Sequence, residues 1–360
     1  MTSGRFVLLA VAVALGAEVS PARAQSAGKW ELEAHGGGLW SSNSTSGSAA
    51  TLPAATPFTT RFGTVSRAES SWMFGDGASL LNATNIALRA INGQITPLDS
   101  VLGVATGSRG NGGSAGFRVA RRFGPRYAAE FSFDYAATPL EFTAKTVDGI
   151  EATRSTFITA WRGLLATGPF VNTNVTATTD LHRSAGHQLL TTGALTVDLT
   201  THGRLVPYVV GGAGIVSNRG DAPVATVTGN YAFSVGGLFP INETDRVTVR
   251  LVPRDHEAVG VFGGGVRYAV SPRWGIRGDV RAHVGGGKLD TLVDATPSVS
   301  TLAPAFFIAS ATIPSIQFSN NPSTGTPSTL SGPAINGLKT FSGSGTAIRT
   351  NVAAGVYFRF

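Results

Sequence analysis

The last nine residues, Val352-Ala-Ala-Gly-Val-Tyr-Phe-Arg-Phe360, alternate in a way that decides the fold. Every second residue from Val352 onward is apolar, whereas the positions between them include Tyr357 and Arg359. Successive side chains of a strand point to opposite faces, so one face is wholly apolar and ends in Phe358 and Phe360. A soluble sheet seldom ends by offering such a face to water. The outer face of an outer-membrane β-barrel must do so, because it meets lipid.

The start of the chain predicts export. Arg5 precedes an apolar run at residues 6–17, and Ala22-Arg23-Ala24 forms a small-x-small cleavage site, so residues 1–24 are expected to be a signal peptide. The alternative is a membrane anchor, but the run is too short to span a bilayer. No apolar run after residue 25 is long enough for a transmembrane helix. Residues 25–360 are therefore expected to cross the outer membrane of a Gram-negative-type bacterium as a closed barrel.

Composition fits an exported barrel without catalytic cofactors. The chain has 46 glycines, 14% charged residues and no cysteine, which excludes disulfides and thiolate metal sites. Its six histidines are scattered, so neither a metal nor another cofactor is expected. The net charge of +7 suits a surface that meets outer-membrane lipids and anionic lipopolysaccharide. The sequence has no cluster of basic residues interleaved with aromatic residues, so it does not predict nucleic-acid binding.

Alternation along the mature chain predicts eight strands. They cover about residues 29–40, 114–123, 127–135, 189–201, 205–216, 259–270, 274–284 and 347–360. Three connections are tight turns at residues 124–126, 202–204 and 271–273, and the others are large loops at about 41–113, 136–188, 217–258 and 285–346. Alternating short and long connections are typical of outer-membrane barrels. The sequence therefore predicts an all-β, eight-stranded, up-and-down antiparallel transmembrane barrel with long extracellular loops.

A soluble β-sandwich or β-rich adhesin is the alternative architecture, because it also explains alternation and export. It explains poorly why aromatic residues stand at strand ends on the apolar parity. We predict that these residues form the interface girdles of a membrane barrel: Trp40, Tyr127, Tyr135, Tyr268 and Trp274, with Phe360 at the end of the chain.

The loops are rich in Ser, Thr, Gly and Pro, and residues 41–60 and 319–345 are expected to be poorly ordered. Residues 76–92 differ, because Leu81, Leu88 and Ile91 recur at helical spacing together with Leu80 and Ala87. We expect a short helix there. It either packs on the barrel rim or caps the mouth of the lumen.

Three stretches resemble the small eight-stranded outer-membrane barrels, the proteins similar to the transmembrane domain of outer membrane protein A and to outer membrane protein X. They are residues 263–285, residues 206–215 and the terminal GVYFRF. The terminal motif also resembles the signal that the barrel-assembly machinery recognises, with Gly355, Phe358 and Phe360 in the matching positions. Ala353 departs from that pattern, which has a polar residue two places before the glycine. The resemblance implies fold, location and assembly partner, but it implies function poorly, because these barrels serve many roles.

The predicted lumen face is charged. It contains acidic and basic side chains that should pair in a narrow space: Glu31, Glu33, Arg118, Glu130, Asp134, Asp198, Arg267, Arg277, Asp279, Arg281 and Arg349. An eight-stranded barrel is just wide enough for side chains to fill it. The favoured interpretation is a structural network that plugs the lumen, and the alternative is a narrow path for ions or small solutes.

An enzymatic alternative rests on His182 and Ser184, the pair that most resembles the signature of lipid A deacylases among small barrels. Residues two apart on a strand share a face, so the pair could act as base and nucleophile. The acid is lacking, because Asp198 lies fourteen residues beyond Ser184 and on the lumen parity. The sequence therefore predicts a non-enzymatic role in envelope structure or surface interaction, with a loop partner that the sequence does not identify. A pore is the first alternative and lipid A modification the second.

Overall fold

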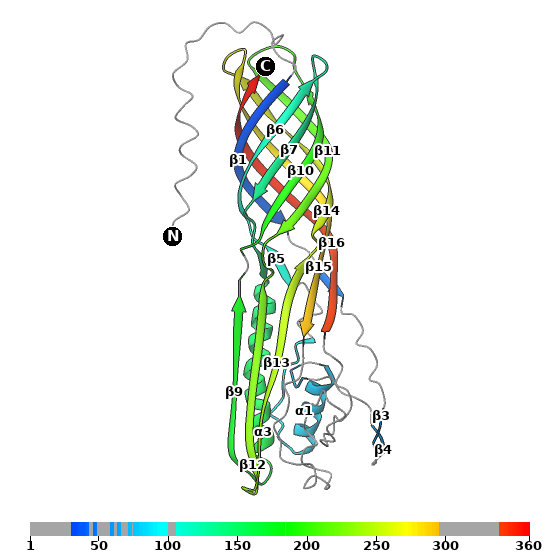
Figure 1. Cartoon of the computed structure of the whole chain (residues 1–360), viewed down its shortest axis with the longest axis vertical. Coiled ribbons are helices and arrows are strands. Elements are labelled where there is room, and N and C mark those ends of the chain that lie inside the picture. The colour runs from blue at the N-terminus through cyan, green and yellow to red at the C-terminus, as the bar shows by residue number, and fades with distance from the viewer. Residues whose placement is uncertain are drawn as a thin grey trace.

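The computed structural model describes residues 30–42, 46–48, 58–60, 63–65, 71–73, 75–99, 106–183, 185–294 and 338–360. Over these ranges the chain forms a closed barrel that is continued at one end by further strands and helices (Figure 1). The barrel strands are β1 (Trp30–Ser42), β6 (Gly112–Arg122), β7 (Tyr127–Ala136), β10 (His187–Asp198), β11 (Leu205–Arg219), β14 (His256–Ala269), β15 (Trp274–Asp294) and β16 (Leu338–Arg359). The expected signal peptide lies outside the described residues.

Strand β16 closes the barrel by pairing on both of its sides. Glu31 of β1 lies opposite Arg359, and Trp274 of β15 lies opposite Phe358. The other strands follow in chain order, and every pairing between neighbours is antiparallel. This confirms the predicted eight-stranded, up-and-down antiparallel barrel and the closure of its last strand on its first.

Tight turns join the strands at the end of the barrel where the C-terminus lies (Figure 1). They cover residues 123–126, 199–204 and 270–273. In the second turn Gly203 has a φ of +98°, a left-handed conformation that glycine adopts at no steric cost. The long connections leave the opposite end, which is the arrangement of outer-membrane barrels with short periplasmic turns.

The two faces of the barrel wall differ as the alternation predicts. Val352 and Val356 are 42% and 43% exposed, whereas Ala353 and Tyr357 are 6% and 1% exposed. Large apolar side chains are exposed on the other strands as well, among them Leu32, Phe131, Leu195, Val209, Phe262 and Val280. An apolar outer face around a polar interior is characteristic of an outer-membrane β-barrel.

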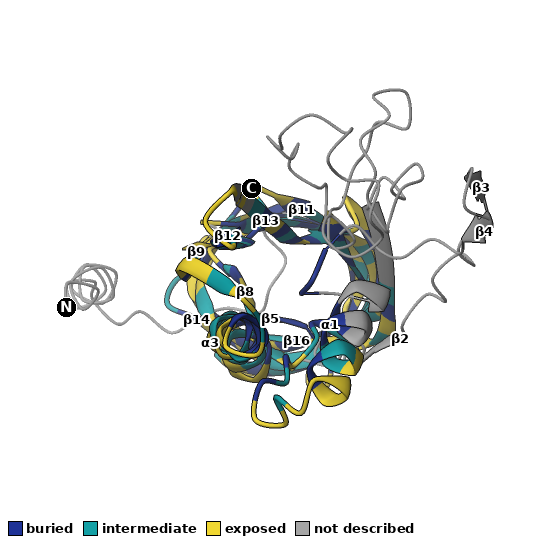
Figure 2. Ribbon diagram, turned by 90° about the horizontal axis from the view of Figure 1, so that it is seen from below, coloured by how far each residue is buried: buried dark blue, intermediate teal, exposed yellow. Residues whose placement is uncertain are grey.

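Beyond the barrel rim the wall continues as an open sheet. Strands β13 (Phe239–Pro253), β12 (Val224–Val235) and β9 (Phe170–His182) add to β15 in that order. Helix α3 (Ala144–Leu165) packs against β9 and β12, and α1 (Gly75–Ala87) packs on α3. Figure 2, viewed from this end, shows α3 end-on at one side of the ring of strands. No helix in the described ranges is long and apolar enough to cross a membrane.

We call β9, β12, β13, α1, α3 and the segment at residues 71–73 the outer module. Its core is aromatic at the centre: the ring of Trp161 stacks on that of Tyr231 with centroids 3.8 Å apart. Trp72 meets Trp161 edge-on at 5.4 Å and donates from Nε1 to the Tyr231 hydroxyl at 3.0 Å. Phe157 and Val249 are fully buried in the same cluster. The outer module therefore has a hydrophobic core separate from the polar interior of the barrel.

The outer module shows that the predicted long connections contain more secondary structure than the one helix expected from the sequence. The segment at 136–188 contains α3 and β9, and the segment at 217–258 contains β12 and β13. Strand β15 continues to Asp294 and β16 begins at Leu338, instead of ending at 284 and beginning at 347. Of the segment 319–345, residues 319–337 lie outside the described residues. Residues 338–345 are rich in Ser, Gly and Thr, but their backbone pairs with β15, so composition wrongly predicted poor order for this part. In the first expected low-complexity segment, β1 extends to Ser42, and short strands β2 (Ser46–Ser48) and β3 (Phe58–Thr60) form. Strand β3 pairs with β4 (Gly63–Val65).

A helix near residues 76–92 was expected, and α1 confirms it over Gly75–Ala87. Its predicted apolar face is partly wrong, because Leu88 and Ile91 lie beyond the end of the helix and are 47% and 70% exposed. Among the helix side chains whose burial is described, the apolar ones that it buries are Ala78 and Leu81. In Figure 1 α1 lies in the outer module, away from the barrel, so it neither sits on the rim nor caps the lumen.

Glycine is required where β1 and β16 meet. A Cβ atom on Gly37 would lie 1.9 Å from the carbonyl oxygen of Val352, whereas one on Gly113 of the neighbouring strand would meet nothing within 4 Å. We expect Gly37→Ala to lower the free energy of unfolding by about 1–3 kcal/mol, because the two backbones must separate. Gly113→Ala is the matched control and should be close to neutral. Urea titration of both variants refolded in vesicles measures the difference, and equal midpoints would contradict this account of the seam.

Candidate functional site

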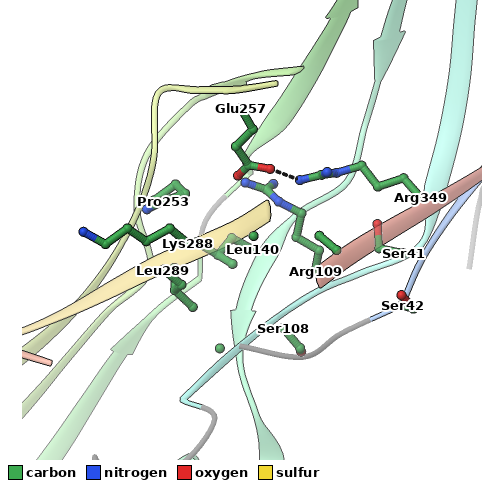
Figure 3. Close-up of a pocket in the computed structure, with 13 residues that line it drawn as sticks. Ser41, Ser42, Ser108, Arg109, Leu140, Pro253, Glu257, Lys288, Leu289 and Arg349 are labelled. Atoms are coloured by element: carbon green, nitrogen blue, oxygen red, sulfur yellow. Dashed lines mark hydrogen bonds and ion pairs between the residues drawn. The ribbon is translucent and has the colours of Figure 1, made fainter. Parts of the chain in front are cut away.

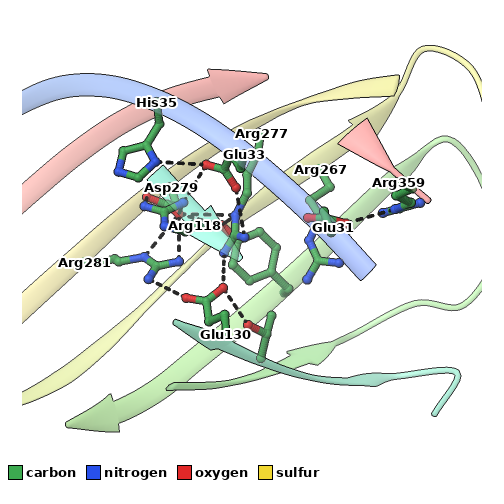
Figure 4. A network of polar contacts seen from close by, with 12 residues as sticks. Glu31, Glu33, His35, Arg118, Glu130, Arg267, Arg277, Asp279, Arg281 and Arg359 are labelled. Atoms are coloured by element: carbon green, nitrogen blue, oxygen red, sulfur yellow. Dashed lines mark hydrogen bonds and ion pairs between the residues drawn. The ribbon is translucent and has the colours of Figure 1, made fainter. Parts of the chain in front are cut away.

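The lumen holds a connected cluster of three arginines and three carboxylates (Figure 4). Arg277 is at its centre. Its Nη1 lies 3.2 Å from Glu33 Oε2 and its Nη2 lies 3.0 Å from Glu130 Oε2. Its Nε donates to the hydroxyl of Tyr208 at 2.6 Å. All three guanidinium nitrogens of Arg277 are therefore bound inside the barrel.

The other two arginines complete the cluster. Arg118 Nη1 lies 2.7 Å from Glu33 Oε1 and 2.8 Å from Asp279 Oδ2. Arg281 Nη1 lies 2.5 Å from Glu130 Oε1, and its Nη2 lies 3.1 Å from Asp279 Oδ2. The formal charges of these six groups sum to zero, so the cluster buries no net charge and each ion has an oppositely charged partner.

His35 and Asp134 extend the cluster toward the module end. His35 Nε2 lies 2.5 Å from Asp134 Oδ1, and its Nδ1 lies 3.6 Å from Glu33 Oε1. Both side chains are buried. Ser132 and Thr192, also buried, form a hydrogen bond between their hydroxyls at 2.7 Å. The middle of the lumen is therefore occupied by hydrogen-bonded side chains.

Two smaller groups lie nearer the turns. Asp198 accepts from Arg122 at 2.9 Å and pairs with Arg267 at 2.8 Å. Glu31 accepts from Arg359 Nε at 2.9 Å. The guanidinium of Arg267 also lies over the Tyr208 ring, 4.7 Å from its centroid. Asp198 of β10 therefore joins β6 and β14, which are not its neighbours in the barrel wall, whereas the pair of Glu31 and Arg359 joins the adjacent strands β1 and β16.

A third group marks the opposite mouth, beside the outer module (Figure 3). Arg349 Nη2 lies 2.5 Å from Glu257 Oε2. Asn218 donates to Glu257 Oε1 at 3.0 Å and accepts from Arg109 Nη2 at 2.5 Å. Arg109 belongs to β5 (Gly107–Arg109), which pairs with β8 (Leu140–Phe142) inside this mouth. Leu140, Leu251 and Leu289 pack together there as a small apolar cluster.

All eleven side chains predicted for the lumen are at most 5% exposed. The structure brings Glu33, Arg118, Glu130, Arg277, Asp279 and Arg281 into one cluster, with Asp134 joined through His35. It places Asp198 with Arg267, and it leaves Glu31 and Arg349 in separate pairs at opposite ends. Sequence analysis missed several partners: His35, Arg109, Arg122, Tyr208, Glu257 and Arg359. His35 and Arg359 alternate in phase with the predicted lumen residues, so the sequence could have identified them. Tyr208 could not be assigned to the lumen, because its strand is apolar on both faces.

The predicted girdle aromatics are 40–52% exposed on the outer face: Trp40, Tyr127, Tyr135, Tyr268 and Trp274. Phe360 is 62% exposed and its ring stacks with that of Phe358, with centroids 6.2 Å apart. Their roles as interface anchors and assembly signal stay predictions. Gly355 has a packing role in addition, because a Cβ atom there would lie 2.7 Å from that of His35.

The structure separates the residues of the enzymatic alternative. His182 is exposed at the end of β9 in the outer module, and Ser184 lies outside the described residues. Asp198 is buried at the turn end of β10, where Arg122 and Arg267 bind it. Among the described side chains, no three His, Asp or Glu residues are grouped so as to hold a metal ion.

No family model matches the chain, and no curated protein matches its sequence. Among solved structures it is similar to the outer membrane protein OprG from Pseudomonas aeruginosa, at 9% identity over 94% of this chain and 100% of that chain, with a TM-score of 0.34. It is also similar to the P. putida toluene transporter TodX, at 9% identity over 93% of this chain and 90% of that chain, with a TM-score of 0.19. At these TM-scores the likenesses are too distant to argue function.

Proposed function

We propose that the chain is exported by a cleaved signal peptide and serves in the outer membrane as a closed, non-enzymatic barrel that presents the outer module at the cell surface. Its role is structural or one of surface interaction. Lipids and lipopolysaccharide contact the apolar outer face, and the barrel-assembly machinery recognises the terminal motif with Gly355, Phe358 and Phe360. The partner of the outer module is a component of the cell surface or of its surroundings.

The observation that carries this proposal is the filled lumen. Arg277 contacts Glu33 and Glu130, which lie on β1 and β7, so one side chain from β15 reaches across the interior. A solute would have to break several buried ion pairs to pass, and each uncompensated charge left behind is costly. The same geometry disfavours the alternative of a narrow pore.

The outer module supplies the second line of support. Its core contains Trp72, Trp161 and Tyr231, which dominate the energetics of packing because of their large apolar area. A folded module at the end of the long connections favours a role in surface interaction. Lipid A modification is disfavoured, because Asp198 and His182 lie on different parts of the fold and cannot act together.

Single-channel recording tests the closed lumen. The refolded full chain in planar lipid bilayers is expected to give no discrete conductance steps, because the charge cluster blocks the lumen. A porin reconstituted by the same protocol is the positive control, and a heat-modifiable gel shift shows that the inserted protein is folded. Reproducible nanosiemens steps from the folded protein would overturn the structural role in favour of a pore.

A further inference from the structure

A small cavity lies at the mouth of the barrel beside the outer module (Figure 3). Its volume is about 60 Å³, and it is bounded by the ends of β1, β13 and β14, by inner positions of β15 and β16, and by β5 and β8. Drug-sized ligands occupy pockets of about 300–1,000 Å³. The cavity therefore suits a small chemical group and not a large molecule.

The lining of the cavity is unbalanced in charge. Apart from Lys288, which pairs with Asp290, it contains two cations, Arg109 and Arg349, and one carboxylate, Glu257, which gives a formal excess of one positive charge. Both oxygens of Glu257 are already used, one by Arg349 and the other by Asn218. One occupied carboxylate does not compensate the two arginines, so this cavity differs from the balanced cluster in the lumen.

Arg349 has donors left over. Its side chain is 3% exposed, and neither Nε nor Nη1 has a hydrogen-bond partner within the described part of the chain. The hydroxyl of Ser41, which also lines the cavity, is buried without a partner there. Buried polar groups of native proteins are almost always hydrogen-bonded. Unsatisfied donors around a cavity therefore point to an acceptor that occupies it.

Arg109, which lies outside the membrane-spanning strands, is a second cation that favours an anionic acceptor in the cavity. Its guanidinium donates to neutral oxygens, the Thr138 carbonyl at 3.2 Å and Asn218 Oδ1 at 2.5 Å. Burial, and then the positive charge of Arg349, lowers the pKa of Arg109 to about 10. Two neighbouring guanidinium groups around one carboxylate favour the binding of a further anion.

The cavity lies where the barrel wall changes its pairing. The ladder between β14 and β15 ends at Val259 and Gly285, and β13 pairs with β15 from Pro253 and Leu289. Lys288 lies between these two ladders, with a side chain that is 35% exposed and 3.6 Å from Asp290. Its ammonium group points away from Glu257 and Arg349 (Figure 3), on the parity of β15 that faces outward, so the donors of the cavity come from the two arginines and Ser41.

We propose that this cavity is a binding site for a phosphate group. Arginine forks match phosphate geometry, the negative charge of a phosphate offsets the excess positive charge of the two arginines, and the Ser41 hydroxyl supplies a further donor. The phosphate comes either from free inorganic phosphate or from the headgroup of a phosphorylated lipid. The site is independent of whether the barrel serves as proposed above.

Calorimetric titration of the refolded full chain in a neutral maltoside detergent tests the site. One arm uses inorganic phosphate, and the other uses short-chain phosphatidic acid. We expect one equivalent to bind in at least one arm, and Arg109→Met to weaken binding about ten- to a hundredfold, because a charge-assisted hydrogen bond is lost. Tighter binding of phosphatidic acid identifies the lipid source, and equal or tighter binding of inorganic phosphate identifies the free ion.

Two further variants keep the test decisive. Arg349→Lys retains the charge beside Glu257 but loses the fork, and it should also weaken binding. Lys145→Met removes an exposed charge from α3 in the outer module and should leave binding unchanged. A heat-modifiable gel shift shows that each variant is folded. Absence of binding in both arms, or binding that the Arg109 and Arg349 variants leave intact, would overturn the proposal.

Discussion

Arg277→Met is expected to lower the free energy of unfolding of the barrel by about 3–5 kcal/mol, the usual cost of removing one partner from a buried ionic network. Methionine fills much of the space, so lost packing contributes little. The cluster would retain three carboxylates, Glu33, Glu130 and Asp279, but only two arginines. The loss therefore comes from an uncompensated buried charge and not from a cavity.

A double variant separates charge from packing. Glu130→Gln combined with Arg277→Met restores two carboxylates for two arginines, so it should recover a large part of the lost stability. Arg273→Met, in the exposed turn before β15, is the control and should stay near the parent value. Urea titration in lipid vesicles, followed by tryptophan fluorescence, measures all three. Equal loss in the single and double variants would show that charge balance is not what holds the lumen.

Trp161→Ala is expected to unfold the outer module and leave the barrel intact. Trp161 is fully buried and contacts both Tyr231 and Trp72. Truncation of a buried tryptophan costs about 3–5 kcal/mol, which is a large share of the stability of a small domain. The barrel should persist because the side chains of its lumen lie outside this cluster, to which β15 contributes Val293 from its extension beyond the rim.

Protease added to intact cells gives the readout. The Trp161 variant should be cleaved within the outer module, and the remaining barrel should keep its heat-modifiable gel shift. Ser155→Ala, at an exposed position of the same helix, should resist cleavage like the parent protein. Loss of the barrel together with the module would show that the two fold as one cooperative unit. Resistance of the Trp161 variant would contradict the assigned core or its position at the cell surface.

Local alternation was enough to predict the barrel. Each side chain of a strand takes one of two faces, so parity alone places Arg277, Asp279 and Arg281 on the same face. The tight turns, marked by Gly and Pro, then fixed the order of the strands. Which charges meet could not be predicted, because strand stagger around a closed barrel decides whether Arg277 reaches Glu33 or Glu31.

The outer module was not predicted from the sequence, for a different reason. Helix α3 has Ile150, Phe157 and Trp161 at helical spacing, but four threonines and two glycines within it weaken its helix propensity. Packing against β9 and β12 supplies the stability that propensity lacks. Residues 338–345 show the same effect in a strand, since pairing with β15 overrides a composition typical of disorder.

The uninterrupted β15–β16 ladder, from Trp274 opposite Phe358 to Asp294 opposite Leu338, has a mechanical consequence. Twenty-one residues at about 3.3 Å each give a two-stranded ladder roughly 70 Å long. One end of this ladder lies in the bilayer, and the other end projects from it. A force along the strands loads the hydrogen bonds of the ladder together in shear, whereas a force perpendicular to the strands would break them one after another. The barrel would therefore hold a surface contact at a fixed height and resist tension normal to the membrane best.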